Sequence, residues 1–273
     1  MSASDTSRTT LILGCGALGA AVAERLRRRG IPVLGVRRSG GAGLLAGDAA
    51  EPELYQRLPL TEITSVLLAA SPGLRRGRDN RLAAAVTLIT RFLPAAHLVY
   101  SGTTAVYADA GGGDADESAS LIGEGPGAGL VAIEQAVLAH QRALVLRFPA
   151  LVGAQRRHAR DRVEAALAAA VPCVVAGDPD RPFSYCHDED AADLCALAAT
   201  GGLAVEGNRV LNAAAPDRMT VRGYYQGFAD QILAGQPAPA GFTIVGDGSA
   251  QPRRRIDAGR LHHLLPDWRW RRP

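Results

Sequence analysis

The feature that most constrains the fold is a glycine-rich turn between two segments of different periodicity. Residues 10–13 form an apolar run typical of a buried strand, and residues 17–29 carry apolar side chains at helical spacing, ended by Gly30. Another apolar run, residues 32–36, follows. The start of the chain therefore predicts a strand, a helix and a second strand parallel to the first.

The turn between the first strand and the helix reads Gly14-Cys15-Gly16-Ala17-Leu18-Gly19, which is the spacing G-x-G-x-x-G. In this position that spacing is typical of a dinucleotide-binding turn. Gly14 permits the tight turn, Gly16 lets the backbone approach a pyrophosphate, and Gly19 allows the helix to pack closely on the strand. We expect the N–H groups at the start of the helix, at Ala17 and Leu18, to bind the anion.

The end of the second strand indicates which nicotinamide cofactor is bound. An acid at this place accepts a hydrogen bond from the ribose 2′-OH of NAD, whereas an arginine accommodates the 2′-phosphate of NADP. The strand ends in Val36-Arg37-Arg38, with Arg37 at the distance from Gly16 where the acid would stand. The sequence favours NADP(H) over NAD(H), with Arg37 and Arg38 on the phosphate. The alternative is that both arginines are solvated charges.

Strands and helices continue to alternate as far as residue 170. Apolar runs at 65–70, 96–101 and 143–148 are separated by helical patterns at 78–92 and up to His140, and a long helical pattern follows at 157–170. This order predicts an α/β fold, a Rossmann-like doubly wound parallel sheet with a small C-terminal substrate lobe. We expect an NAD(P)-binding domain over residues 1–172, with returning segments from the C-terminal part, and a substrate-binding lobe mostly in 173–273.

Three residues at predicted strand ends join the expected cofactor site. Ala70 and Ser71 close the third strand, and Ser101 closes the fourth. Because the carboxyl ends of parallel strands meet at one edge of a sheet, we expect these residues to lie beside the glycine turn.

Composition excludes several classes of protein. The 30 basic and 27 acidic residues give a net charge of only +3, in short scattered clusters, which argues against nucleic acid as a partner. The sequence contains no lysine, which excludes Schiff-base chemistry on this chain. No apolar run approaches the ~20 residues of a membrane span. The polar N-terminal residues do not resemble a secretory signal, so a cytoplasmic protein is expected. The 4 cysteines show no metal-binding spacing.

Three further segments carry a family resemblance. Residues 101–107, SGTTAVY, resemble the pattern S-S-x-x-V-Y-G, and residues 146–153, LRFPALVG, resemble L-R-x-x-x-I-Y-G. Residues 183–190, FSYCHDED, resemble N-x-I-H-V-x-D. With the glycine turn, the chain resembles the short-chain dehydrogenase/reductase superfamily, specifically its atypical or extended NAD(P)-dependent epimerase/dehydratase-like members. The resemblance spans nearly the whole chain and implies a nicotinamide cofactor and a small-molecule substrate.

The chain departs from this family at the catalytic centre. The family's chemistry rests on a Ser or Thr, a Tyr and a Lys, the last two spaced as Tyr-x-x-x-Lys. Counting back from Glu134, the lysine position falls at Leu130 and the tyrosine position at Pro126, and neither side chain transfers a proton. Thr103 matches the Ser or Thr that orients a substrate carbonyl. Its alternative role is to cap its own backbone.

Other residues could complete the site. Ser101 and Thr104 are close enough to Thr103 to share its task. The missing tyrosine could be replaced by Tyr107, Tyr185 or His187, although a packing role is the alternative for His187. Just past the fifth strand, Arg156 and Arg157 are candidates for binding an anionic substrate group, with surface solvation as the alternative.

The leading hypothesis is an NADP(H)-dependent oxidoreductase that acts on a small carbonyl, imine or hydroxyl substrate without the usual Tyr-x-x-x-Lys pair. An imine suits this departure, because a protonated iminium needs no strong acid from the protein. The alternatives are a cofactor-retaining epimerase or dehydratase, and a non-catalytic NADP(H) sensor. The helices at 78–92 and 127–140 suggest a possible homodimer.

Overall fold

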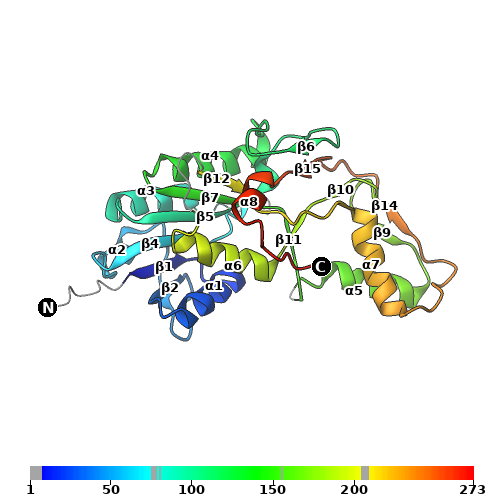
Figure 1. The fold of residues 1–273 in the computed structure, drawn as a ribbon, viewed down its shortest axis with the longest axis horizontal. Coiled ribbons are helices and arrows are strands. Elements are labelled where there is room, and N and C mark those ends of the chain that lie inside the picture. Colours follow the sequence, from blue (N-terminus) through cyan, green and yellow to red (C-terminus); the bar gives the residue numbers. More distant parts are fainter. Residues whose placement is uncertain (1–7, 75–78, 80, 155, 204–208) are drawn as a thin grey trace.

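Seven parallel strands form the central sheet of the computed structural model, which describes residues 8–74, 79, 81–154, 156–203 and 209–273. Their order is β12-β7-β5-β4-β1-β2-β3 (Figure 1). The strands are β1 (Thr9–Leu13), β2 (Val33–Arg37), β3 (Leu45–Ala46), β4 (Ile63–Leu68), β5 (His97–Thr103), β7 (Ala143–Phe148) and β12 (Val210–Asn212). The predicted Rossmann-like α/β class is confirmed.

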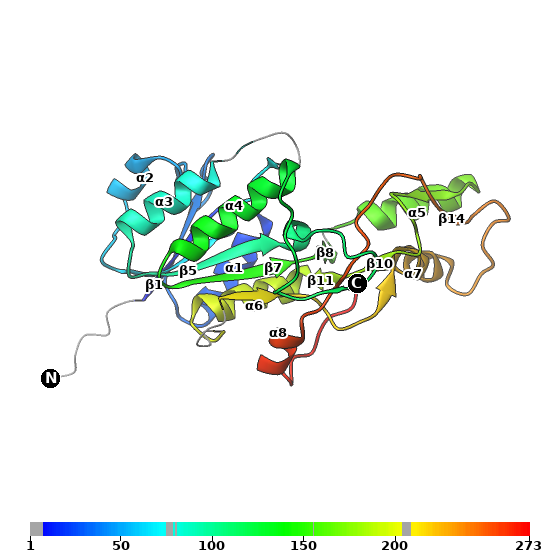
Figure 2. The same cartoon turned by 90° about the horizontal axis from the view of Figure 1, so that it is seen from above.

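Helices cover both faces of this sheet. On one face lie α1 (Ala17–Arg28) and α6 (Asp188–Ala199), and on the other lie α2 (Pro52–Gln56), α3 (Leu82–Phe92) and α4 (Gly125–Ala139) (Figure 2). Every residue of β1 and of β7 is buried, because strands covered on both sides have no solvent face. This burial explains why both segments are almost continuously apolar.

A smaller lobe stands beyond the carboxyl ends of the strands, at the right of Figure 1. It contains α5 (His158–Ala169), α7 (Val221–Leu233) and two strand pairs. The pairs are β9 (Cys173–Val175) with β14 (Ile244–Gly246), and β10 (Pro182–Phe183) with β13 (Met219–Thr220). Val163, Cys173, Ala229 and Phe242 share its core.

The division of the chain after residue 172 stays a proposal. In the structure, α5 precedes this point and packs in the same core as β9, which follows it. Beyond the same point, α6 and β12 return to the central sheet. The lobe is therefore built from segments that alternate along the chain with segments of the larger domain.

Short elements connect the two parts. β8 (Ala150–Val152) pairs in parallel with β11 (Tyr185–His187), and β6 (Asp114–Ala115) pairs with β15 (Arg255–Ile256). The 3-10 turn η2 (Thr104–Val106) follows β5, and α8 (Gly259–Leu264) packs beside β12. Because β8 begins two residues after β7 ends, the β8–β11 pair carries the chain directly from the sheet toward the lobe.

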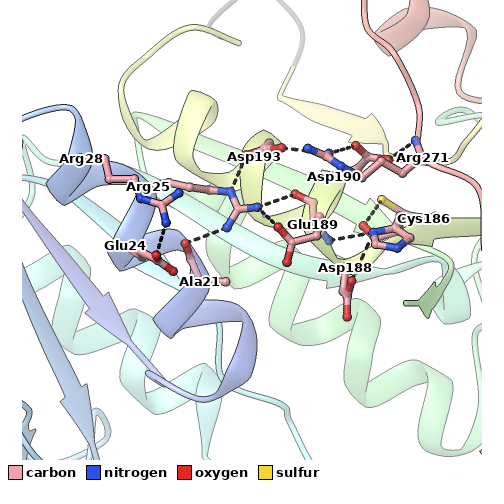
Figure 3. Close-up of polar contacts among 11 residues, drawn as sticks. Ala21, Glu24, Arg25, Arg28, Cys186, Asp188, Glu189, Asp190, Asp193 and Arg271 are labelled. Carbon is pink, nitrogen blue, oxygen red and sulfur yellow. Dashed lines mark hydrogen bonds and ion pairs between the residues drawn. The ribbon is translucent and has the colours of Figure 1, made fainter. Parts of the chain in front are cut away.

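Residues 265–273, which we call the C-terminal segment, pack on the core that includes α6, and Arg271 lies beside the first turns of this helix (Figure 3). The Arg271 backbone N–H donates to Asp190 Oδ2 at 2.8 Å, and its guanidinium pairs with Asp190 and with Asp193. Arg25 of α1 pairs with Asp193 and with Glu189. Asp190 is 0% exposed, so the ion pair with Arg271 compensates a carboxylate that water does not reach.

The described helices also bear on membrane association. Among the residues that the structure describes, no helix combines the length and the apolar character needed to cross a bilayer.

Candidate functional site

A cleft of about 1110 Å³ opens at the carboxyl edge of the sheet. It lies where the strand order reverses between β1 and β4, which is where open α/β sheets bind ligands. Residues after β1, β2, β4 and β5 line it, together with the start of α1 and parts of α4 and β8. Of the predicted cofactor residues, the lining includes Gly14, Gly16, Ala17, Leu18, Arg37, Arg38, Ala70, Ser71 and Ser101.

The glycine turn, residues 14–19, has the geometry of a pyrophosphate cradle. Gly14 has φ +88°, and a Cβ there would lie 2.5 Å from the backbone nitrogen of Ala70. Gly19 stands behind the cleft, where a Cβ would lie 2.9 Å from the Gly14 carbonyl oxygen. A Cβ on Gly16 would meet nothing within 4 Å, so open space faces the residue that precedes α1. The turn therefore fits a dinucleotide whose phosphates bind the helix N-terminus.

One end of the cleft is formed by the ends of β2 and β3. Arg37 and Arg38 line it with exposed side chains, and their predicted role in binding a phosphate stays a prediction. Asp48 also lines this end and accepts a hydrogen bond from the Ala50 N–H at 3.0 Å. The Gly47 N–H donates to the Arg37 carbonyl at 3.2 Å, which holds the two strand ends together.

Sequence reasoning missed Asp48 and its neighbours Gly47 and Ala49. A strand of two residues has no readable periodicity, and β3 lies inside a glycine-rich stretch that reads as a loop. The dipeptide Gly47-Asp48 before the helical pattern of residues 51–58 was the available signal.

The other end of the cleft contains Ser101 and Thr103, which belong to the last three residues of β5. Thr103 Oγ1 accepts a hydrogen bond from the Ala105 N–H at 3.1 Å, so this hydroxyl caps η2 as the alternative reading expected. The same hydroxyl still has a proton to donate toward the cleft. Thr104, by contrast, is buried outside the lining, and its carbonyl accepts from Arg254 at 3.1 Å.

Leucine side chains form the wall where the family places its lysine. Leu130, at the counted lysine position on α4, lines the cleft and is 4% exposed. Leu74 and Leu151 line the same region. Gly129 lets the Leu74 side chain pack against α4, because a Cβ on Gly129 would lie 2.7 Å from Leu74 Cδ1. This wall contributes no proton donor.

Tyr107 lies in a buried polar network rather than in the cleft lining. Its hydroxyl donates to Asn212 Oδ1 at 2.7 Å and accepts from Arg147 Nη1 at 2.7 Å. Arg147 is itself paired with the buried Glu134 carboxylate. Burial raises the pKa of Tyr107, and the neighbouring Arg147 only partly offsets this. Tyr107 therefore lies outside the lining, its one hydroxyl proton is donated to Asn212, and its raised pKa makes it a weaker acid, so its catalytic role stays a prediction.

Tyr185 and His187 also lie outside the described lining. The Tyr185 hydroxyl donates to Asp217 Oδ2 at 2.6 Å, and burial raises its pKa above the ordinary value. His187 caps α6, where Nδ1 accepts from the Glu189 N–H at 3.2 Å and lies 3.2 Å from Asp188 Oδ1. Each side chain is engaged in holding β11 and its surroundings. Their catalytic role stays a prediction.

The two arginines predicted for the substrate are separated. Arg156 lines the cleft with an exposed side chain, and its backbone N–H donates to the Gly153 carbonyl at 2.9 Å. Arg157 precedes α5 and pairs with Asp161 at 3.1 Å and Glu164 at 3.7 Å, outside the lining. Of the two arginines, only Arg156 lines the cleft.

The comparisons with known proteins point to one family. Residues 10–214 match the family model described as NAD dependent epimerase/dehydratase family. A search of curated proteins finds no match.

Solved structures share the fold over nearly the whole chain. A dTDP-glucose 4,6-dehydratase from Bacillus anthracis, in complex with NAD, is 15% identical with a TM-score of 0.75, covering 97% of this chain and 92% of that chain. A UDP-glucose 4-epimerase from Brucella ovis, in complex with NAD, is 16% identical with a TM-score of 0.74, covering 95% and 92%. A functionally unknown protein from Silicibacter pomeroyi is 23% identical with a TM-score of 0.73, covering 97% and 94%.

The predicted resemblance to nicotinamide-dependent enzymes is thereby confirmed at the level of the family. The family match covers most of the chain, and it includes the glycine turn, the ends of β4 and β5, and the start of α6. The chain belongs to the NAD-dependent epimerase/dehydratase family.

Proposed function

We propose that this chain is an NADP(H)-dependent oxidoreductase that exchanges hydride with a small carbonyl, imine or hydroxyl substrate. The observation that carries the proposal is a single cleft that joins the glycine turn, two arginines at the β2 end and the Thr103 hydroxyl. The nicotinamide cofactor, when bound, supplies or accepts hydride at C4 of its ring. The residues of this chain bind the cofactor and position the substrate.

The preference for NADP(H) rests on Arg37 and Arg38. Both side chains are exposed at the cleft, and neither has a carboxylate partner among the described residues. A planar guanidinium can bind a phosphate through two parallel hydrogen bonds. A 2′-phosphate on the adenine ribose would therefore meet two cations that form no ion pair among the described residues, beside the single carboxylate of Asp48.

At the other end, Thr103 donates a hydrogen bond to the polar atom of the substrate, and Arg156 binds an anionic substituent. The wall of Leu74, Leu130 and Leu151 excludes water from the reacting atoms. Because this wall holds no acid, a substrate that already carries its proton is favoured, and an iminium ion meets that requirement.

A cofactor-retaining epimerase or dehydratase is the second candidate, favoured by the family itself and by the names of two structural neighbours. Such enzymes oxidise and re-reduce one substrate, which requires a group that moves protons at the reacting carbon or oxygen. Leu130 and Thr103 do not provide a strong base. Retention of cofactor through purification, with turnover but no net change in NADPH absorbance, would support this candidate over the first.

The cofactor proposal is tested by calorimetric titration with NADPH and NADH. We expect NADPH to bind at least about tenfold more tightly, a difference of ~1.4 kcal/mol, and Arg37→Ala or Arg38→Ala to remove most of it. Arg27→Ala is the matched control, because it removes the same charge from an exposed site on α1 outside the lining. If neither nucleotide binds, the proposal is wrong.

The substrate proposal is tested by NADPH consumption with matched pairs of ketones and preformed cyclic iminium ions. We expect turnover of the iminium and at least about 100-fold less of the ketone, because general acid catalysis contributes about 10²–10⁴-fold. Thr103→Val should lower kcat on either substrate, and Thr103→Ser should retain most of it. Consumption with ketones alone would overturn the iminium preference. If the cofactor binds without any turnover, a sensor of NADP(H) becomes the better description.

A further inference from the structure

The charged residues of the cleft are distributed unevenly along it. Among the lining residues that the structure describes, Asp48 is the only carboxylate, and it lies at the β2–β3 end with Arg37 and Arg38. At the other end the lining contains one charged side chain, that of Arg156. This side chain is exposed and has no carboxylate partner among the described residues. The end near Thr103 is therefore net positive.

Two carboxylates lie close to this end but do not line it. Glu134 is 2% exposed and accepts two hydrogen bonds from Arg147 Nε, at 3.1 and 3.0 Å, so the buried pair has no net charge. Asp188 lies against Gly153, where a Cβ would come within 2.5 Å of its carboxyl carbon, and is not part of the lining. Neither carboxylate forms an ion pair with Arg156 among the described residues.

The remaining surface of this end is apolar. Leu130 is buried in the wall, and Leu74 and Leu151 are half-buried beside it. An apolar wall solvates a cationic ring poorly, whereas it costs an uncharged ring nothing. Desolvation and the charge of Arg156 therefore act in the same direction on any ring that occupies this end.

The dinucleotide places its nicotinamide at this end, given phosphates at the glycine turn and the adenine ribose at Arg37. The oxidised nicotinamide ring carries a positive charge and the reduced ring carries none. We propose that this end of the cleft selects the redox state of the cofactor, binding NADPH more tightly than NADP⁺, and that Arg156 with the wall of Leu74, Leu130 and Leu151 produces the selection. The inference rests on the proposed function, since it presupposes that NADP(H) occupies the cleft.

Selection of this kind shifts the reduction potential of the bound cofactor. Reduction of NADP⁺ adds two electrons and one proton, so tighter binding of the reduced form raises the potential of the bound couple. A tenfold preference corresponds to ~30 mV. NADPH is then held until its hydride leaves for the substrate, and NADP⁺ is released because it binds more weakly. Because a raised potential makes bound NADPH a weaker reductant, the same preference shifts the equilibrium of hydride transfer on the protein toward NADPH and oxidised substrate.

The test is parallel calorimetric titration of the 273-residue chain with NADPH and with NADP⁺, at one pH and one ionic strength. We expect NADPH to bind about tenfold more tightly. Arg156→Gln should lower this ratio to about threefold, and added salt should have the same direction of effect on the wild type. Arg160→Gln is the matched control, because Arg160 carries the same charge on α5 but pairs with Glu164 outside the lining.

A second pair of variants separates charge from shape. Leu74→Glu places a carboxylate in the wall and should invert the ratio, whereas Leu74→Gln has nearly the same shape and should keep NADPH ahead. Arg37→Ala should weaken both nucleotides equally and leave the ratio unchanged. Equal affinities for NADPH and NADP⁺ in the wild type would overturn the inference while leaving the proposed cofactor intact. Absence of binding by either nucleotide would instead overturn the proposed function.

Discussion

Removing the guanidinium of Arg271 is expected to destabilise the whole protein, although this side chain is about half exposed and only two residues of the sequence follow it. Its partner Asp190 is 0% exposed on α6 (Figure 3). Truncating one member of a buried ion pair costs about 3–5 kcal/mol, because the remaining charge is left without compensation. In Arg271→Ala the backbone N–H still donates to Asp190 Oδ2, and the Arg271 side chain is partly solvated, so we expect a cost at or just below the lower limit of this range, about 2–3 kcal/mol.

The magnitude is measurable by thermal and urea unfolding followed by circular dichroism. For chains of 150–250 residues, 1 kcal/mol shifts Tm by about 2–4 °C, so Arg271→Ala should lower Tm by roughly 4–12 °C. In an Asp190→Asn background no charge remains at position 190, and adding Arg271→Ala should then cost less than about 1 kcal/mol. Arg269→Ala is the control, because Arg269 is exposed and makes no ion pair among the described residues.

Two results would refute this reasoning. The first is an Arg271→Ala variant as stable as Arg269→Ala, since surface substitutions usually stay within about 0.5 kcal/mol. The second is that Arg271→Ala costs as much free energy of unfolding in the Asp190→Asn background as in the wild type. This would show that the guanidinium acts through something other than the charge of Asp190.

Three further outcomes are expected. Gly14→Ala should abolish nucleotide binding, because its Cβ would lie 2.5 Å from the Ala70 nitrogen; Gly30→Ala, also at positive φ but facing open space, should cost only about 1 kcal/mol of stability and keep calorimetric binding. Burial raises the pKa of Cys195 from 9.0 to about 12, so the unfolded chain loses its proton first and stability should fall as pH rises above 9; a Cys195→Ala variant whose urea midpoint falls as steeply between pH 9 and 11 would contradict this. If α3 and α4 form the homodimer interface that the sequence suggests, light scattering should give twice 28.5 kDa, and Ala132→Glu on the exposed face of α4 should give the monomer.

The sequence predicted the parts of the fold that depend on local patterns. The glycine turn, α1 and the parallel strands on either side have strong periodicity and glycine spacing, and the observed α1 ends at Arg28, within two residues of the expected end. Arg37 and Arg38 could be placed because the end of β2 is fixed relative to the turn. These predictions required no knowledge of distant contacts.

The candidate proton donors could not be resolved in this way. Tyr107 follows a strand that leads to the cleft, but its hydroxyl is taken by Asn212, more than 100 positions along the chain, and by Arg147. Tyr185 is held similarly by Asp217. Proximity to a strand end says that a side chain is near an edge, whereas the direction in which it turns is decided by partners brought in by the fold.

The alternation of lobe and sheet segments has a mechanical consequence. The chain leaves the sheet after β7, returns through β11 and α6, leaves again after β12, and comes back at β15. The two parts are thus joined by four connecting segments of the chain, or crossings, rather than by one linker. Hydrogen bonding between β8 and β11 holds two of these crossings side by side. A single protease cut at any crossing leaves the others intact, so neither part can be separated as an autonomous fragment. Any movement of the lobe relative to the sheet must bend all four crossings together, and it therefore depends on the stiffness of the β8–β11 ladder.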